Sequence, residues 1–269
     1  MPSTPHPVHE TQGFRYVDEG PAATLPPLVL LHGMMGDPGN WSATVAALAA
    51  RGYRVLAPEL PIYDLPAAQT SVQGLTDYLH AFLRTVHDGP VALGGNSLGG
   101  HVALRYALQH PDRVVSLVLS GASGIYEVEI GSSTMRRRDR DFIRERAALT
   151  FYRDDLVTED LVERIYHLIN DRVRALRLIR MARSVQAETL THRLPDIKAP
   201  TLLIWGRDDR ITPPDVAETF ARLLPRAELH FLDRCGHAPM MEHPDRFNAI
   251  LLDFARRTLG VPPRLALSS

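Results

Sequence analysis

The fold of this chain is decided by the stretch Gly95-Asn96-Ser97-Leu98-Gly99-Gly100. It follows an apolar run over residues 91–94 and precedes a helical pattern over residues 101–109. A Gly-x-Ser-x-Gly sequence between a strand and a helix forms a sharp, strained turn, with glycine at 95 and 99 because no side chain fits there. This turn exposes the Ser97 hydroxyl at the carboxyl edge of a sheet. It also points the amide of Leu98, in the first turn of the helix, to where an oxyanion would form.

Composition excludes several classes of protein. The chain has 269 residues, 45% of them hydrophobic and 23% charged, with a net charge of -1, so neither nucleic acid nor an anionic membrane surface is an expected partner. Its single cysteine, Cys235, excludes an intrachain disulfide and a cluster of thiolate metal ligands. Residues 1–10 lack the basic start and apolar stretch of a signal peptide, and no apolar run is long enough to span a membrane. We expect a cytoplasmic monomer or homodimer without metal or cofactor.

Short apolar strands alternate with longer helical patterns along most of the chain. This alternation favours a parallel sheet covered by helices on both faces. Residues 13–18 instead alternate polar and apolar side chains, which predicts a half-exposed antiparallel edge strand. The other expected strands are residues 27–31, 53–57, 90–93, 114–119, 201–205 and 228–232, and the expected helices are residues 43–50, 71–86, 98–109, 215–224 and 244–259.

The alternation breaks between residues 121 and 195. This segment is rich in arginine, notably at residues 136–138 and 172–183, and its apolar residues recur at helical spacing. We expect a mostly helical insertion. A charge run of this kind is more often a solvated helix face than an anion site.

Three groups of polar residues follow strands of the predicted sheet, where ligands bind in open α/β folds. They are Ser97, the acidic pair Asp208-Asp209 after residue 205, and Cys235-Gly236-His237 after residue 232. A serine hydroxyl needs a base to take its proton, and a histidine needs a buried carboxylate to fix its tautomer. Only one of the two aspartates should reach the imidazole, because successive turn residues point differently. A thiol nucleophile at Cys235 is the less favoured alternative, since a lone small residue beneath a strand end usually packs in the core.

The loop His32-Gly33-Met34, directly after residues 27–31, supplies the second oxyanion donor. A tetrahedral intermediate needs a second amide besides that of Leu98. Gly33 allows the tight turn and Met34 offers its N–H. We expect His32 to hold the loop through its ring nitrogens rather than to act as a base.

These motifs together resemble the α/β-hydrolase superfamily over residues 13–259. The resemblance rests on His32-Gly33, the serine turn, Trp205-Gly206-Arg207-Asp208-Asp209-Arg210 followed by Pro213, and Cys235-Gly236-His237 followed by Glu242-His243-Pro244. It implies an α/β-hydrolase fold, a mostly parallel eight-stranded sheet flanked by helices with a helical lid inserted after strand six. It also implies that Asp209 is the catalytic acid. The predicted parts are a core of residues 1–123 and 196–269 and a lid of residues 124–195.

Within the superfamily the chain is similar to small carboxylesterases and to meta-cleavage-product hydrolases, which split carbon-carbon bonds of vinylogous diketones. Asn96 and the run ending at His237 are typical of the latter, but those enzymes usually carry tryptophan where this chain has Ala238. They also bind the substrate carboxylate with a lid arginine, for which Arg164 is the candidate here. The leading hypothesis is a serine hydrolase that cleaves small carboxylic esters through an acyl-enzyme. The alternatives are carbon-carbon hydrolysis by the same triad, with a diketone as substrate, and a ligand receptor without catalysis.

Overall fold

A computed structural model describes residues 6–21, 25–128 and 136–262 of the chain. The strands of these residues form an 8-stranded sheet in the order β1-β2-β4-β3-β5-β6-β7-β8. Strands β1 and β2 pair antiparallel with each other, β2 pairs antiparallel with β4, and all other neighbours are parallel. The strands are β1 (Val8–Thr11), β2 (Phe14–Glu19), β3 (Leu28–Leu31), β4 (Val55–Pro58), β5 (Val91–Asn96), β6 (Val114–Ser120), β7 (Thr201–Gly206) and β8 (Ala227–Leu232).

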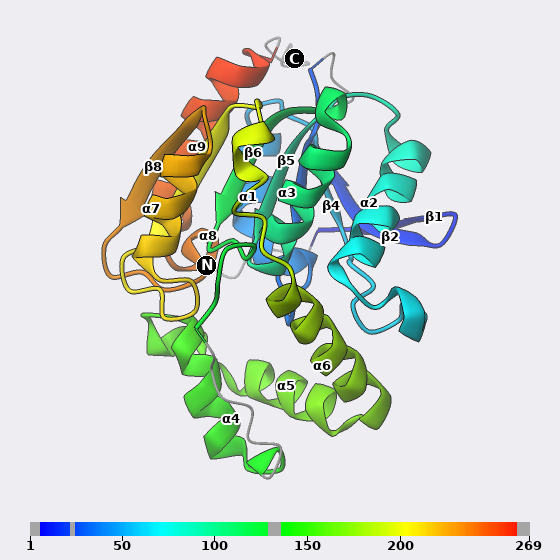
Figure 1. Cartoon of the computed structure of the whole chain (residues 1–269), viewed down its shortest axis with the longest axis vertical. Coiled ribbons are helices and arrows are strands. Elements are labelled where there is room, and N and C mark those ends of the chain that lie inside the picture. The colour runs from blue at the N-terminus through cyan, green and yellow to red at the C-terminus, as the bar shows by residue number, and fades with distance from the viewer. Residues whose placement is uncertain (1–5, 22–24, 129–135, 263–269) are drawn as a thin grey trace, which may run out of the picture.

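Burial explains which segments become central strands. Every residue of β3, β4, β5 and β7 is buried, as expected of parallel strands covered on both faces. Helices α2 (Val72–Val86), α3 (Leu98–Gln109) and α7 (Pro214–Leu223) pack in one hydrophobic core, and α1 (Ser42–Ala49) and α9 (Pro244–Leu259) pack in a second. The sheet therefore separates two cores, as the alternating sequence pattern predicts (Figure 1).

Between β6 and β7 the chain leaves the sheet and forms α4 (Arg140–Ala147), α5 (Glu159–Asn170) and α6 (Arg172–Ala187). The side chains of Asp139, Thr158 and Asp171 cap their N-termini. In Figure 1 these helices gather at one end of the sheet, away from the layers that cover its faces. The Leu190 N–H donates to the Gly124 carbonyl at 2.7 Å, which joins the two ends of the insertion. The division into core and lid at residues 124 and 195 stays a prediction.

The prediction for residues 13–18 is wrong about the edge. The segment forms β2 and pairs antiparallel, but β1 pairs with its outer side and is itself the edge. Three of the four β1 residues are exposed, so β1 has no apolar pattern that could reveal it in the sequence.

Short helices of the described residues are α8 (Pro239–Glu242) and the 3-10 turns at Pro38–Trp41, Ala67–Gln69, Pro111–Arg113, Ala148–Thr150, Asp154–Leu156 and Leu194–Asp196.

No helix in the described ranges combines the length and the apolar character needed to cross a bilayer.

The close approach of α3 to β3 leaves no room for a side chain at Gly99, which can be tested by substitution. A Cβ at this position would lie 2.3 Å from the Leu31 carbonyl oxygen and 2.7 Å from that of His32, and neither backbone group can rotate away. Gly99→Ala should therefore lower the free energy of unfolding by about 3 kcal/mol, measured by urea denaturation. In the control Gly89→Ala the new methyl group meets only the His87 ring, which can move, so we expect a change of about 0.5 kcal/mol. Equal losses would contradict this account.

Candidate active site

The turn from β5 to α3 holds Ser97 in a strained conformation. Ser97 has φ 54° and ψ -122°, a left-handed backbone that a residue with a side chain rarely adopts. A Cβ on Gly95 would lie 2.3 Å from the carbonyl carbon of Gly99, so the two glycines allow the strand and the helix to meet. The Ser97 N–H donates to the Ser120 carbonyl at 3.1 Å, which ties the turn to β6. The result is a partly exposed serine at the carboxyl end of β5.

His237 and Asp209 form a buried pair beside this turn. The Nδ1 atom of His237 lies 2.9 Å from Asp209 Oδ2 and 3.1 Å from Oδ1, and each residue is only 4% exposed. Asp208, the other acidic candidate, is less buried, and its N–H donates to the Cys235 carbonyl. Of the two candidates, Asp209 is the residue that contacts the imidazole.

Asp209 is itself held by residues that sequence reasoning missed. Its Oδ1 accepts hydrogen bonds from the backbone N–H groups of Ile211 and Thr212, both at 2.9 Å. The Thr212 hydroxyl donates to Oδ2 at 2.9 Å. The Thr212 carbonyl in turn accepts from Trp205 Nε1 at 2.8 Å. An aspartate that starts a turn commonly bonds to the amides two and three residues ahead, and this pattern could have indicated the role of Thr212.

Opposing effects set the pKa of His237. Burial of the ring lowers its pKa, but the charge of Asp209 and the hydrogen bond to it outweigh burial and raise the pKa above its usual value. The charges of Glu127 and Glu242 add to the increase. An imidazole that binds a proton readily, next to a partly exposed serine, is suited to general base catalysis near neutral pH.

The loop after β3 lies against Ser97. A Cβ on Gly33 would be 3.3 Å from the Ser97 Cβ, so this backbone passes directly beside the serine. The N–H groups of Met34 and Leu98 donate to no acceptor among the described residues. Leu98 is the first residue of α3, and the first amides of a helix have no partner within the helix. Tyr63 fixes the loop by donating from its hydroxyl to the Met34 carbonyl at 2.6 Å. Two unpaired donors thus lie near the serine.

His32 supports this loop as a neutral ring. Its Nε2 accepts from the Leu60 N–H at 2.9 Å, which leaves Nδ1 to donate to the Gly33 carbonyl, also at 2.9 Å. Burial lowers the pKa of His32 and outweighs the effect of the Gly33 carbonyl, so the ring can both accept and donate at neutral pH. His32 thus joins the loop at Gly33 to the backbone of Leu60, and its role at the site stays a prediction.

The backbone of His237 is held from two sides. The Nδ2 atom of Asn96 donates to the His237 carbonyl and to the Ser120 carbonyl, both at 2.9 Å. The His237 N–H donates to the Thr150 carbonyl at 2.7 Å, in the inserted segment. Within the described residues no hydrogen bond joins the Ser97 hydroxyl to the His237 ring, and such catalytic contacts often form only when substrate binds.

Glu242 links the inserted segment to the histidine loop. Its Oε1 accepts from the Gly236 N–H at 2.7 Å, and its Oε2 accepts from the N–H groups of Tyr152 and Arg153 at 2.8 and 3.1 Å. The residue is 2% exposed, so these three amides compensate a carboxylate that burial would otherwise penalise. The sequence marks Glu242 only as part of the run after His237, and its partners in the insertion are far from it in the chain.

Cys235 is fully buried, and burial raises the pKa of its thiol far above the usual value. A thiol that stays protonated is a poor nucleophile, which removes the support for the cysteine alternative. Among the described ranges, no group of three or more His, Cys, Asp or Glu side chains is arranged to hold a metal ion.

Arg164 lies outside this buried cluster. Its guanidinium is exposed and forms an ion pair with Asp37 at 2.7 Å. Asp37 lies three residues after Met34 in the chain. Its role in binding substrate stays a prediction.

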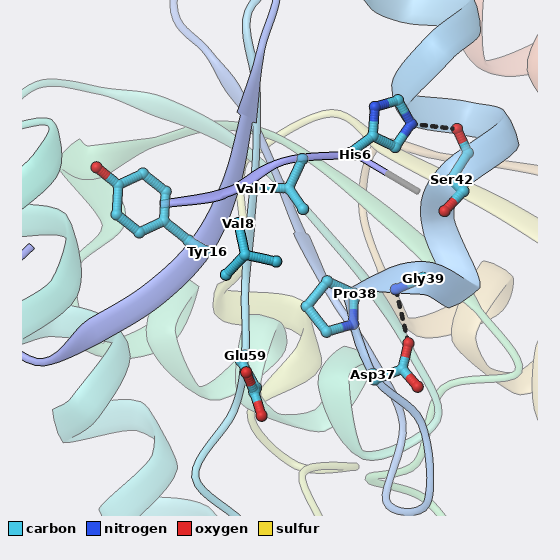
Figure 2. Close-up of a pocket in the computed structure, with 9 residues that line it drawn as sticks. All are labelled: His6, Val8, Tyr16, Val17, Asp37, Pro38, Gly39, Ser42 and Glu59. Atoms are coloured by element: carbon cyan, nitrogen blue, oxygen red, sulfur yellow. Dashed lines mark hydrogen bonds between the residues drawn. The ribbon is translucent and has the colours of Figure 1, made fainter. Parts of the chain in front are cut away.

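A separate cavity of about 280 Å³ lies between β1, β2 and the turn at Pro38–Trp41 (Figure 2). Neither Ser97, Asp209 nor His237 lines it. The ring of His6, which lines it, already has protein partners in the Glu19 carboxylate and the Ser42 carbonyl. This cavity is therefore not part of the candidate active site.

A family model described as the alpha/beta hydrolase family matches residues 28–250, which include every residue of the site. The chain belongs to the alpha/beta hydrolase family.

The hydrolase is similar to several known proteins and solved structures over most of its length. It is 33% identical over 252 residues to a 2-hydroxy-6-oxononadienedioate/2-hydroxy-6-oxononatrienedioate hydrolase of Burkholderia vietnamiensis (strain G4 / LMG 22486), covering 86% of this chain and 87% of the relative. It is 30% identical over 252 residues to a 2-hydroxy-6-oxo-6-phenylhexa-2,4-dienoate hydrolase of Burkholderia cepacia, covering 84% and 86%. An alpha/beta hydrolase enzyme from the sediment metagenome of the lagoon of Mar Chica, Morocco, has a TM-score of 0.76 at 34% identity, over 93% of this chain and 98% of that one. A meta-cleavage product hydrolase from Pseudomonas fluorescens IP01 has a TM-score of 0.76 at 25% identity, over 91% and 95%.

The hydrolase makes a pH-dependent prediction at His237. Because Asp209 raises the pKa of His237 in the folded state, the pair stabilises the protein below about pH 6.5, and this contribution is lost as pH rises through the folded-state pKa. Asp209→Asn removes the charge that raises the pKa of His237, while burial still lowers it. We therefore expect the imidazole pKa to fall below the wild-type value. Histidine NMR, with the resonance assigned by its absence in His237→Gln, measures this directly.

The same variant gives an independent check by urea unfolding. The stability difference between wild type and Asp209→Asn should grow as pH falls from about 8 to 6. An unchanged imidazole pKa together with a pH-independent difference would contradict the pairing.

Proposed function

We propose that this hydrolase cleaves a carbon-carbon bond in vinylogous diketones of the meta-cleavage-product type through an acyl-enzyme on Ser97. The chemistry is supported by the buried Asp209–His237 pair beside the strained Ser97. The substrate class is supported by the 33% identity to the Burkholderia vietnamiensis hydrolase over 86% of the chain. This assignment replaces ester cleavage as the leading hypothesis.

In the first half-reaction His237 takes the proton of the Ser97 hydroxyl as the oxygen adds to the ketone carbon. The N–H groups of Met34 and Leu98 stabilise the resulting oxyanion, and loss of one such donor typically costs about 10²–10³ in turnover. When the carbonyl reforms, the bond to the neighbouring carbon breaks. The electron pair of that bond moves into the conjugated 2-oxo-enoate of the ketonised substrate, and protonated His237 returns a proton to the resulting dienolate. His237 also assists the prior shift of the substrate from enol to ketone.

The second half-reaction removes the acyl group. His237, neutral again, takes a proton from water as the water oxygen adds to the ester carbon. The same two amides hold the second oxyanion, and the Ser97 oxygen leaves with the proton that His237 carries. Asp209 keeps Nδ1 of the ring protonated in both halves, so that Nε2 faces the reacting groups. The products are a carboxylic acid and a hydroxydienoate.

Ester cleavage is the second candidate, and a specific residue favours it. Ala238 occupies the position at which the carbon-carbon hydrolases that this chain resembles usually carry tryptophan. The residue after His237 is therefore small and carries no aromatic ring. Attack by Ser97 on an ester needs no ketonisation of the substrate.

Stopped-flow kinetics with two substrates separate the candidates. With 2-hydroxy-6-oxo-6-phenylhexa-2,4-dienoate, we expect the dienol absorbance to disappear with turnover and benzoate to form in equal amount. With p-nitrophenyl butyrate, we expect a burst of p-nitrophenol followed by a slower steady state. Ser97→Ala should reduce turnover of both by at least about 10⁴-fold.

A fluorophosphonate located by mass spectrometry provides the control, because it should label Ser97 in wild type and nothing in Ser97→Ala. Turnover of the ester without cleavage of the diketone would make ester hydrolysis the function. Binding of the diketone without turnover or label would instead favour a receptor.

A further inference from the structure

A carboxylate other than that of Asp209 lies beside the turn of residues 95–99 that carries Ser97, which we call the nucleophile turn. Glu127 belongs to the segment that leaves β6, and the Ser123 hydroxyl donates a hydrogen bond to its carboxylate. The Ser123 N–H in turn donates to the Ser97 carbonyl at 3.1 Å. The residue after Glu127, Val128, donates its N–H to the Ile211 carbonyl at 2.8 Å. Ile211 belongs to the loop of residues 207–212 that carries Asp209, which we call the acid loop. These bonds place Glu127 between the nucleophile turn and the acid loop.

The charge of Glu127 acts on the site, and no ion pair with a described residue balances it. It contributes to raising the pKa of His237, after the larger opposed effects of burial and Asp209. Glu127 is partly buried, and no lysine or arginine of residues 6–21, 25–128 and 136–262 forms an ion pair with it. A partly buried carboxylate without a partner acts on whatever charge enters the same space.

Two arginines lie near the loop His32-Gly33-Met34, which carries the Met34 amide. Arg164 reaches Asp37 at the end of the oxyanion loop. Burial raises the pKa of Tyr63, while the positive charge of Arg174 opposes the increase, so Arg174 lies near the tyrosine that holds Met34. The positive charge of Arg164 is already balanced by Asp37, while that of Arg174 acts on Tyr63.

We propose that Glu127 is a specificity-determining residue, which selects a neutral or cationic substrate group beside the nucleophile turn and directs any substrate carboxylate away from that turn. This inference rests on the proposed hydrolase function of the same site. Two like charges at roughly 8 Å in an effective dielectric of about 20 repel enough to change binding by on the order of tenfold or more, and salt screens part of this. A dienoate carboxylate would therefore bind in one orientation, with its charge away from Glu127.

Glu127→Gln tests the proposal, because the amide oxygen can still accept from Ser123 while the charge is lost. We compare kcat/KM for three p-nitrophenyl esters at low ionic strength: the neutral butyrate, the anionic hydrogen glutarate and the cationic 4-(trimethylammonio)butyrate. The butyrate should change less than about threefold, the glutarate should rise about tenfold, and the cationic ester should fall about tenfold. Glu127→Lys should move the two charged esters further in the same directions.

A matched control is Glu218→Gln, which removes an exposed carboxylate on α7. It should leave the ratios of the three esters at the wild-type values. Equal changes for all three esters in Glu127→Gln, or the same discrimination in Glu218→Gln, would overturn the assignment. Should wild type turn over none of these esters, the labelling rates of Ser97 by a neutral and a carboxylate-bearing fluorophosphonate give the same comparison.

These outcomes are independent of the reaction that the enzyme catalyses. Charge discrimination on esters, without diketone cleavage by wild type, would refute the carbon-carbon proposal and support the role of Glu127. Diketone cleavage without charge discrimination would do the reverse.

Discussion

The close approach of β5, α3 and β3 constrains every other part of the site. Gly95 lets the strand and the helix meet, and Gly99 lets the helix pass the carbonyl groups at the end of β3. Because the helix begins immediately after Ser97, its first amide is unpaired beside the serine. The same contact brings the loop that follows β3 next to Ser97. One packing constraint therefore positions the nucleophile and both amides of the candidate oxyanion hole.

The candidate base is positioned by long-range hydrogen bonds. Asn96, the last residue of β5, holds the His237 carbonyl, and Thr150 in the insertion accepts the His237 N–H. Glu242 binds the histidine loop with one oxygen and the inserted segment with the other. These bonds make the inserted segment part of the support of the histidine. Thr150, Tyr152 and Arg153 of the inserted segment thus all contribute hydrogen bonds to the loop that carries the imidazole or to Glu242 beside it.

Electrostatics divide the work among three carboxylates near His237. Asp209 contacts the ring and stabilises its protonated form, while Glu242 is compensated by backbone amides and acts mainly through structure. Glu127 retains a charge without a cationic partner in the described part of the chain. The oxygens of the first two already accept hydrogen bonds from the protein, Asp209 from Ile211 and Thr212, and Glu242 from three backbone amides. Glu127 is the least buried of the three, and we propose that it acts on the substrate.

The sequence by itself determined the order and type of the central elements, and it supplied the candidates Ser97, His237, Met34 and Leu98 together with the acidic pair Asp208-Asp209. It could do so because buried parallel strands are continuously apolar, and because a glycine-flanked serine between a strand and a helix is typical of a nucleophile turn. It could not choose between Asp208 and Asp209 without the family resemblance, since both follow the same strand and only side-chain direction separates them. It also missed the edge strand β1, whose residues are mostly exposed and carry no apolar pattern. Thr212 lies three residues after Asp209, so a local turn pattern could have revealed it. The contacts of Glu242 with the insertion, and those of the Glu127 segment with the loop of Asp209, were decided by tertiary structure alone. A hydrogen bond between distant segments leaves no periodic signal in the chain.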